Sequence, residues 1–323
     1  MSANVRNMAV ESIGKVLLDE KRPLKERFRA LFTLKNLGGH VAIQQIGRCF
    51  CDPSELLKHE CAFCLGQMQD TAAMPILIKL LKDRNNECIV RHEAGEALGA
   101  IGNKDALNML EEFIIVSLFL QVAETCQLAV GRIRWLHSRD RFNEVLPDNP
   151  YMSVDPAPPC EERDVDRLKK TLLNENLFIF ERYRALFSLR NQGGKDKISK
   201  KVPTCKNLMG LNCKSALFRH EIAYVLGQMQ DPIAVPFLTE NLSKLTEHPM
   251  VRHECAEAIG GIGTKEGLET LQKFLNDEQR VVRESCEVAL DMSEYQLSDE
   301  FQYSMLRCVF HGHDGGPQHL YIV

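Results

Sequence analysis

The stretch that decides the fold is Val90–Gly102, which reads VRHEAGEALGAIG. It recurs in the second half of the chain as VRHECAEAIGGIG at Val251–Gly263. The same offset aligns Leu57–Asp70 with Phe218–Asp231, and both of these stretches end in LGQMQD. Long stretches that repeat at one offset indicate a tandem duplication. The chain of 323 residues therefore consists of two similar halves.

A shorter period runs inside each half. Leu34, Leu65, Leu98 and Val130 occupy equivalent places at a period of about 32 residues, which lies in the range of structural repeats. Apolar residues at three- and four-residue steps predict a helix in each unit, and a preceding helix such as Ala72–Leu81 completes a hairpin. Paired helices at this period are typical of HEAT-type repeats. We therefore predict an all-α fold, a HEAT-like α-solenoid of eight helical-hairpin repeats in two symmetric four-repeat halves.

Changes in sequence character predict four segments. The first is an N-terminal HEAT-repeat half at residues 1–136, and the second is a linker at 137–166 in which five prolines disfavour helix. The third is a C-terminal HEAT-repeat half at 167–296, and the last is an irregular tail at 297–323. The apolar run Ile114–Gln121 departs from the pattern, because its counterpart in the second half is a polar turn.

The composition is typical of a soluble globular protein, with 44% hydrophobic and 26% charged residues. A formal net charge of −4 gives no electrostatic reason to expect a nucleic-acid partner. No apolar run approaches the ~20 residues of a membrane span, and the N-terminus has no signal-peptide pattern. Cys61, Cys126, Cys255 and Cys286 fall at small apolar repeat positions. This placement predicts free thiols and a reducing, cytoplasmic location.

Four His-Glu dipeptides occur at equivalent repeat positions, as two pairs with the same internal spacing. They are His59-Glu60, His92-Glu93, His220-Glu221 and His253-Glu254. The first, fourth, fifth and eighth repeats carry other residues there, namely Phe28-Arg29, Glu124-Thr125, Tyr183-Arg184 and Glu284-Ser285. A fold that required His-Glu would place it in every repeat. The pattern therefore favours a functional role over a solvated charged face.

The residue types point to metal chemistry. Each half supplies two imidazoles and two carboxylates, and two histidines with one carboxylate form the ligand set of non-haem Fe(II) oxygenases. A structural zinc site would more often use cysteine and close its coordination sphere. Consecutive His and Glu residues lie about 100° apart round a helix and cannot both point straight at one atom. We therefore expect one glutamate of each half to bind metal directly and the other to take a supporting or substrate-binding role.

A duplicated HEAT solenoid with two His-Glu pairs per half resembles the deoxyhypusine hydroxylase family, over roughly Glu26 to Tyr295. The resemblance implies a monooxygenase with two Fe(2+) ions per chain that uses O2. Its protein substrate would be translation initiation factor 5A, on which it hydroxylates the deoxyhypusine side chain to form hypusine. The resemblance assigns one iron to His59, His92 and Glu93, and the other to His220, His253 and Glu254. Glu60 and Glu221 would be catalytic partners of the substrate amines, or additional ligands.

Two other functions remain open at this point. A non-catalytic HEAT scaffold would bind a protein partner on its concave face and would hold no metal. A two-metal hydrolase would use zinc or manganese and consume no oxygen, and ligand type by itself does not exclude manganese.

Overall fold

The computed structural model describes residues 3–193 and 209–296, and within these ranges every regular element is a helix. The first half contains α1 (Ala3–Leu17), α2 (Leu24–Leu37), α3 (Gly39–Arg48), α4 (Glu55–Gln67), α5 (Met74–Lys82), α6 (Cys88–Ile101), α7 (Leu107–Val116) and α8 (Leu120–Leu136). The second half contains α9 (Val165–Leu173), α10 (Ile179–Gly193), α12 (Ala216–Met229), α13 (Val235–Ser243), α14 (Pro249–Ile262), α15 (Lys265–Lys273) and α16 (Arg280–Gln296). The all-α solenoid prediction is confirmed, whereas the count of eight repeats stays a prediction. The predicted tail at 297–323 lies outside the described residues.

Short sequence signals set the helix ends. Ser54 caps the N-terminus of α4, because its hydroxyl accepts a hydrogen bond from the Leu57 amide. Ser215 caps α12 in the same way. At the other end, α6 and α14 stop at Gly102 and Gly263, whose φ angles of 75° and 71° are left-handed and favour glycine.

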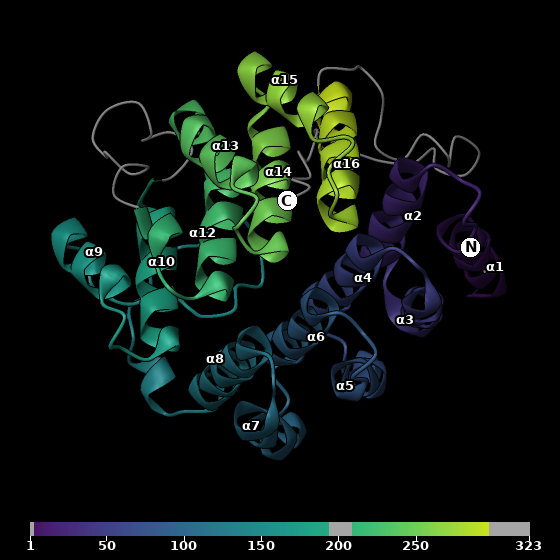
Figure 1. Ribbon diagram of the computed structural model, residues 1–323. Helices are drawn as coiled ribbons and strands as arrows, with labels where there is room; N and C mark the ends of the chain where they lie inside the picture. The colour runs from purple at the N-terminus through teal and green to yellow at the C-terminus, as the bar shows by residue number, and fades with distance from the viewer. Residues whose placement is uncertain (1–2, 194–208, 297–323) are drawn as a thin grey trace, which may run out of the picture.

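The second helices of the hairpins form two rows that meet at both ends (Figure 1). In the first row α2, α4, α6 and α8 pack side by side, and in the second row α10, α12, α14 and α16 do the same. Helix α8 then contacts α10 and α12, while α16 contacts α2 and α4. Arg29 on α2 reaches Asp291 on α16 at 3.0 Å, although 262 residues separate them. The solenoid therefore closes into a ring with its second helices inside.

A buried arginine ties the two helices of four hairpins together. The Nε atoms of Arg27, Arg91, Arg182 and Arg252 each donate to the backbone carbonyl ten residues earlier, at 2.8, 3.0, 2.9 and 2.8 Å. That carbonyl lies in the last turn of the preceding helix, where backbone oxygens lack an intrahelical partner. Arg91 and Arg252, which precede His92-Glu93 and His253-Glu254, are thus packing residues, and in these two motifs the histidine and glutamate are left available for chemistry.

The remaining sequence expectations concern cysteines, membranes and the apolar run. The ten cysteines that the structure describes are all free, and Cys61, Cys126, Cys255 and Cys286 are fully buried. None of the described helices is long and apolar enough to cross a bilayer. In the apolar run, Ile115 and Leu118 are exposed where α7 turns into α8.

Candidate metal centre

The four predicted histidines converge at the centre of the ring. His59 comes from α4, His92 from α6, His220 from α12 and His253 from α14. Within each half, the ring centroids of His59 and His92 are 5.6 Å apart, and those of His220 and His253 are 5.3 Å apart. Between the halves, His59 lies 5.2 Å from His253, and His92 lies 5.3 Å from His220. Side chains from opposite halves of the sequence therefore form one cluster.

Small residues let the histidine-bearing helices come this close. A Cβ added to Gly66 on α4 would lie 2.7 Å from the Cα of Ala97 on α6. On the far side of α14, a Cβ on Gly260 would lie 2.8 Å from the Cα of Ala289 on α16. Both distances are too short for a side chain, so only glycine permits this helix spacing. The close stacking of α4 on α6 brings the imidazoles of His59 and His92 within reach of a shared ion.

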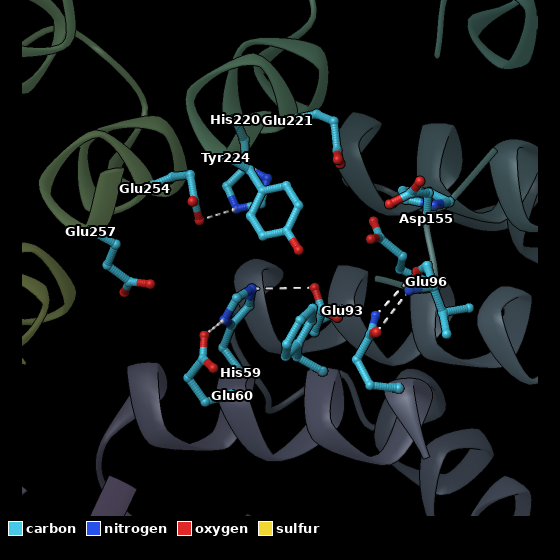
Figure 2. A pocket seen from close by; sticks show the side chains of 14 residues that line it. His59, Glu60, Glu93, Glu96, Asp155, His220, Glu221, Tyr224, Glu254 and Glu257 are labelled. Carbon is cyan, nitrogen blue, oxygen red and sulfur yellow. Dashed lines mark hydrogen bonds and ion pairs between the residues drawn. The ribbon is translucent and has the colours of Figure 1, made fainter. Parts of the chain in front are cut away.

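The four predicted glutamates line the same centre and are almost completely buried. Glu93 and Glu254 are each 3% exposed, and Glu221 is 2% exposed. Oε2 of Glu93 lies 3.3 Å from Nε2 of His59, and Oε2 of Glu254 lies 3.3 Å from Nε2 of His220 (Figure 2). In the part of the chain that the structure describes, no lysine or arginine forms an ion pair with any of the four glutamates. Because a buried unpaired carboxylate is costly, the arrangement calls for a cation.

The imidazoles also lack hydrogen-bond partners. Both ring nitrogens of His59, His92 and His220, Nε2 of His253 and Oε1 of Glu254 are buried and make no hydrogen bond of good geometry, although a carboxylate oxygen lies 3.3 Å from Nε2 of His59 and of His220. Buried polar atoms in a folded protein are nearly always satisfied, so a group of orphans at one place indicates an absent partner. Imidazole nitrogens and carboxylate oxygens are ligands that divalent transition metals accept. The residues present therefore fit a metal ion.

Among the described residues, three sets of side chains bring together ligand atoms, one from each residue, that all lie within 4.8 Å of one another. One set is His220, His253 and Glu254, the same three residues that the family resemblance assigns to one iron. The other two sets are His59 with His92 and His220, and His92 with Glu93 and Glu96. Because one set spans both halves, the division of the ligands between two ions stays a prediction.

Burial keeps most of the cluster in the form that binds metal. Burial lowers the pKa of His92 and of His253 well below 6.5, and it lowers the pKa of His220 to about 4, with His59 as the next cause. These imidazoles are neutral at neutral pH, as metal ligation requires. Burial alone would also lower the pKa of His59, but the adjacent carboxylates of Glu60 and Glu93 raise it well above 6.5.

Sequence reasoning missed four further residues that line the pocket around the histidines. Glu96 and Glu257 line the pocket one helical turn after His92 and His253, at the i+4 position that shares their face. The two glutamates occupy equivalent places in the duplicated stretch, so the offset between the halves was a usable signal. Phe63 and Tyr224 line the pocket at the same offset, with ring centroids 6.4 Å apart.

The linker enters the pocket, which no sequence pattern indicated. The backbone of Val154 pairs with the side chain of Gln67. Its carbonyl accepts a hydrogen bond from Nε2 at 3.1 Å, and its amide donates one to Oε1 at 2.9 Å. The next residue, Asp155, forms a buried ion pair with Arg190 on α10. The pocket encloses about 480 Å³ of empty space, open solvent at its mouth included. Its wall is therefore built from both halves and from the segment between them.

These features define a class of protein: a HEAT-repeat α-solenoid, closed into a ring, that encloses a histidine-carboxylate centre. The HEAT-repeat family model matches residues 41–117 and 181–291. Deoxyhypusine hydroxylases of mouse and human are 54% and 53% identical to the chain over 300 residues, covering 93% of it and 96% of each relative. The structure of human deoxyhypusine hydroxylase in complex with glycerol superposes with a TM-score of 0.84, at 54% identity over 90% of this chain and 98% of that one. The chain belongs to the deoxyhypusine hydroxylase family and is therefore an enzyme of the hydroxylating, oxidoreductase type.

Proposed function

We propose that this enzyme hydroxylates the deoxyhypusine side chain of translation initiation factor 5A to form hypusine, using O2 and two Fe(2+) ions per chain. The single observation that carries the proposal is the cluster of four buried histidines and four buried glutamates, in which no lysine or arginine of the described chain forms an ion pair with a glutamate. The relatives' name supplies the reaction and its substrate. A cationic substrate suits the site, because each of its ammonium groups would place a positive charge beside a buried carboxylate that has no lysine or arginine partner.

The ligand roles are those that the family resemblance implies. His59, His92 and Glu93 would hold one iron, and His220, His253 and Glu254 would hold the other. Bound iron would supply the activation of O2. The chain's own part is to keep His92, His220 and His253 neutral through burial and to hold the carboxylates beside them. Burial also keeps water from the reacting carbon.

Glu60 and Glu221 would orient the substrate. Each follows a histidine directly and lines the pocket. Oε1 of Glu60 is 3.3 Å from Nδ1 of His59, whereas the carboxylate of Glu221 forms no ion pair within the described residues. A carboxylate that receives an ammonium hydrogen bond fixes the position of the aminobutyl chain, and such positioning lowers a reaction barrier. Free buried thiols and the lack of a membrane-crossing helix among the described residues support a cytoplasmic enzyme.

Metal content and product together test the proposal. Protein prepared anaerobically with excess iron should contain about two irons per chain, and on exposure to O2 it should add one oxygen atom to a deoxyhypusine-bearing protein. Metal analysis and intact-protein mass spectrometry measure the two quantities. Zinc or manganese in place of iron, with no oxygen consumed, would support the hydrolase alternative. Protein that binds no metal under these conditions would contradict the proposed function.

A further inference from the structure

The pocket is nearly two-fold symmetric, and the linker breaks that symmetry. Five pairs of lining residues are related by the duplication: His59 and His220, Glu60 and Glu221, Phe63 and Tyr224, Glu93 and Glu254, Glu96 and Glu257. The other lining residues are Gln67 and the linker residues Val154, Asp155 and Pro156. A linear substrate could lie in either of two opposite directions in a symmetric pocket. The linker makes the two ends chemically different.

At the end away from the linker, the carboxylates have partners within the chain. Oε1 of Glu257 accepts a 2.9 Å hydrogen bond from the Ser285 hydroxyl and lies 3.4 Å from Nδ1 of His253. Glu60 lies within ion-pair distance of His59. Glu257 is therefore satisfied within the chain and has less affinity left for an added ammonium than an unpaired carboxylate would have.

At the linker end, the equivalent carboxylates lack partners. Oε2 of Glu96 is buried without a hydrogen bond. Thr125 stands where Ser285 stands in the other half, but its buried hydroxyl makes no hydrogen bond. Glu221 is 2% exposed and has neither a hydrogen bond nor an ion pair within the described residues. Figure 2 shows Glu96, Asp155 and Glu221 gathered on one side of the pocket, opposite Glu257.

Asp155 does not share this deficit. Its carboxylate accepts hydrogen bonds from Arg190 at 2.8 and 2.5 Å, from Ser153 at 2.6 Å and from Asn149 at 3.1 Å. It therefore anchors the linker rather than binding a ligand. The neighbouring Val154 and Pro156 add apolar surface beside the unpaired glutamates. The linker end thus combines two unpaired carboxylates with a short apolar wall.

We propose that Glu96, beside the linker, joins Glu221 in the subsite for the terminal ammonium of the aminobutyl chain, and that the methylenes lie along Val154 and Pro156. The subsite fixes one of the two possible substrate directions. Glu96 is then a substrate-binding residue rather than a metal ligand. The inference rests on the proposed function, because that function supplies the cationic aliphatic substrate.

Two matched variants test it, Glu96→Gln and Glu257→Gln, which remove the same charge at equivalent positions. Iron per chain, circular dichroism, KM for the deoxyhypusine-bearing protein and affinity for butane-1,4-diamine by calorimetry are measured on the iron-loaded enzyme. Loss of a charge-assisted hydrogen bond should weaken diamine binding and raise KM by at least about tenfold in Glu96→Gln. The effect of Glu257→Gln on both quantities should be several-fold smaller. Glu96→Asp, which keeps the charge, should recover part of the affinity.

Each contrary outcome has a distinct meaning. Equal effects of the two variants would overturn the asymmetry, and loss of iron from Glu96→Gln with normal helicity would make Glu96 a metal ligand. If wild-type enzyme binds the diamine more tightly than Glu96→Gln does but hydroxylates nothing, the proposed function fails and the subsite stands. If wild-type enzyme hydroxylates while Glu96→Gln keeps normal diamine affinity and KM, the subsite fails and the function stands.

Discussion

The hydroxyl of Ser54 donates a 2.6 Å hydrogen bond to Oε2 of Glu284, which is 230 residues away at the other end of the described chain. Its counterpart is the 2.7 Å hydrogen bond from Ser215 to Glu124, where the two halves meet a second time. Both serines also cap a helix that carries a metal-centre histidine. Each closure of the ring therefore bears directly on the position of one histidine.

These contacts explain what replaces His-Glu in the outer repeats. Glu124 and Glu284 occupy the histidine position of the fourth and eighth repeats, and they reach across to the opposite half. Arg29 and Arg184 occupy the glutamate position of the first and fifth repeats, where they pair with Asp291 and Glu144. The two adjacent helix positions thus carry the proposed metal ligands in the inner repeats and make contacts between distant segments in the outer ones.

The first prediction concerns ring closure. A double-mutant cycle of Ser54→Ala and Glu284→Gln should give a coupling energy of about 1–2 kcal/mol, because the bond joins a buried hydroxyl to a charged acceptor. Urea unfolding measures it, and the cycle removes the separate cost of losing the cap on α4. The Arg134 and Glu111 pair on the exposed surface serves as a control and should couple by less than about 1 kcal/mol. A coupling energy near zero between Ser54 and Glu284 would mean that other contacts stabilise the closed ring.

The second prediction links metal to stability. Iron at about 100 times its dissociation constant should stabilise wild-type protein by about 2.7 kcal/mol, since the unfolded chain does not assemble the site. In His59→Ala and His220→Ala this gain should fall sharply and hydroxylation should be lost, while helicity stays near normal. Thermal unfolding with and without iron provides the measurement. An undiminished gain in either variant would show that the two halves do not share the binding.

The third prediction concerns pH in metal-free protein. Burial lowers the folded-state pKa of His220 from 6.5 to about 4, so between these values the unfolded chain binds one proton more at this residue. The contribution of neutral His220 to stability is therefore complete above about pH 6.5 and is lost as the pH falls towards 4. The slope is at most about 1.4 kcal/mol per pH unit. In urea unfolding at several pH values, the free energy of unfolding of His220→Asn should depend less steeply on pH than that of wild type, by up to this slope. Parallel profiles of the two proteins would contradict the assignment.

The fourth prediction concerns the linker. Gln67→Ala removes both hydrogen bonds to Val154 and should raise KM for the protein substrate by about tenfold, with the iron content unchanged. Gln69→Ala is the matched control, because it removes a side-chain bond to the Ala100 carbonyl at 3.0 Å outside the pocket. Steady-state kinetics at saturating O2 compares the two. Equal KM values in the two variants would show that the linker does not position the substrate.

Much of the architecture was predictable because helical repeats produce a periodic pattern of apolar residues in the sequence. The constant offset between matching stretches established two related halves, and the restriction of His-Glu to inner repeats selected eight residues that the structure brings together. Glu96 and Glu257 were within reach of the same reasoning, since each follows a histidine by one helical turn. The contribution of Val154 to the pocket could not be predicted in this way, because the linker lies outside the repeats and has no equivalent residues to align with it.

The sequence by itself determined the helices, the duplication and the repeat positions that carry the side chains of the candidate metal centre. Each of these depends on residues a few positions apart or on repetition along the chain. Only the tertiary structure decided that the solenoid closes, that His59 faces His253, and that the linker lines one end of the pocket. These relationships rest on single side-chain contacts between distant segments, such as Ser54 with Glu284, and such contacts leave no periodic signal in the sequence.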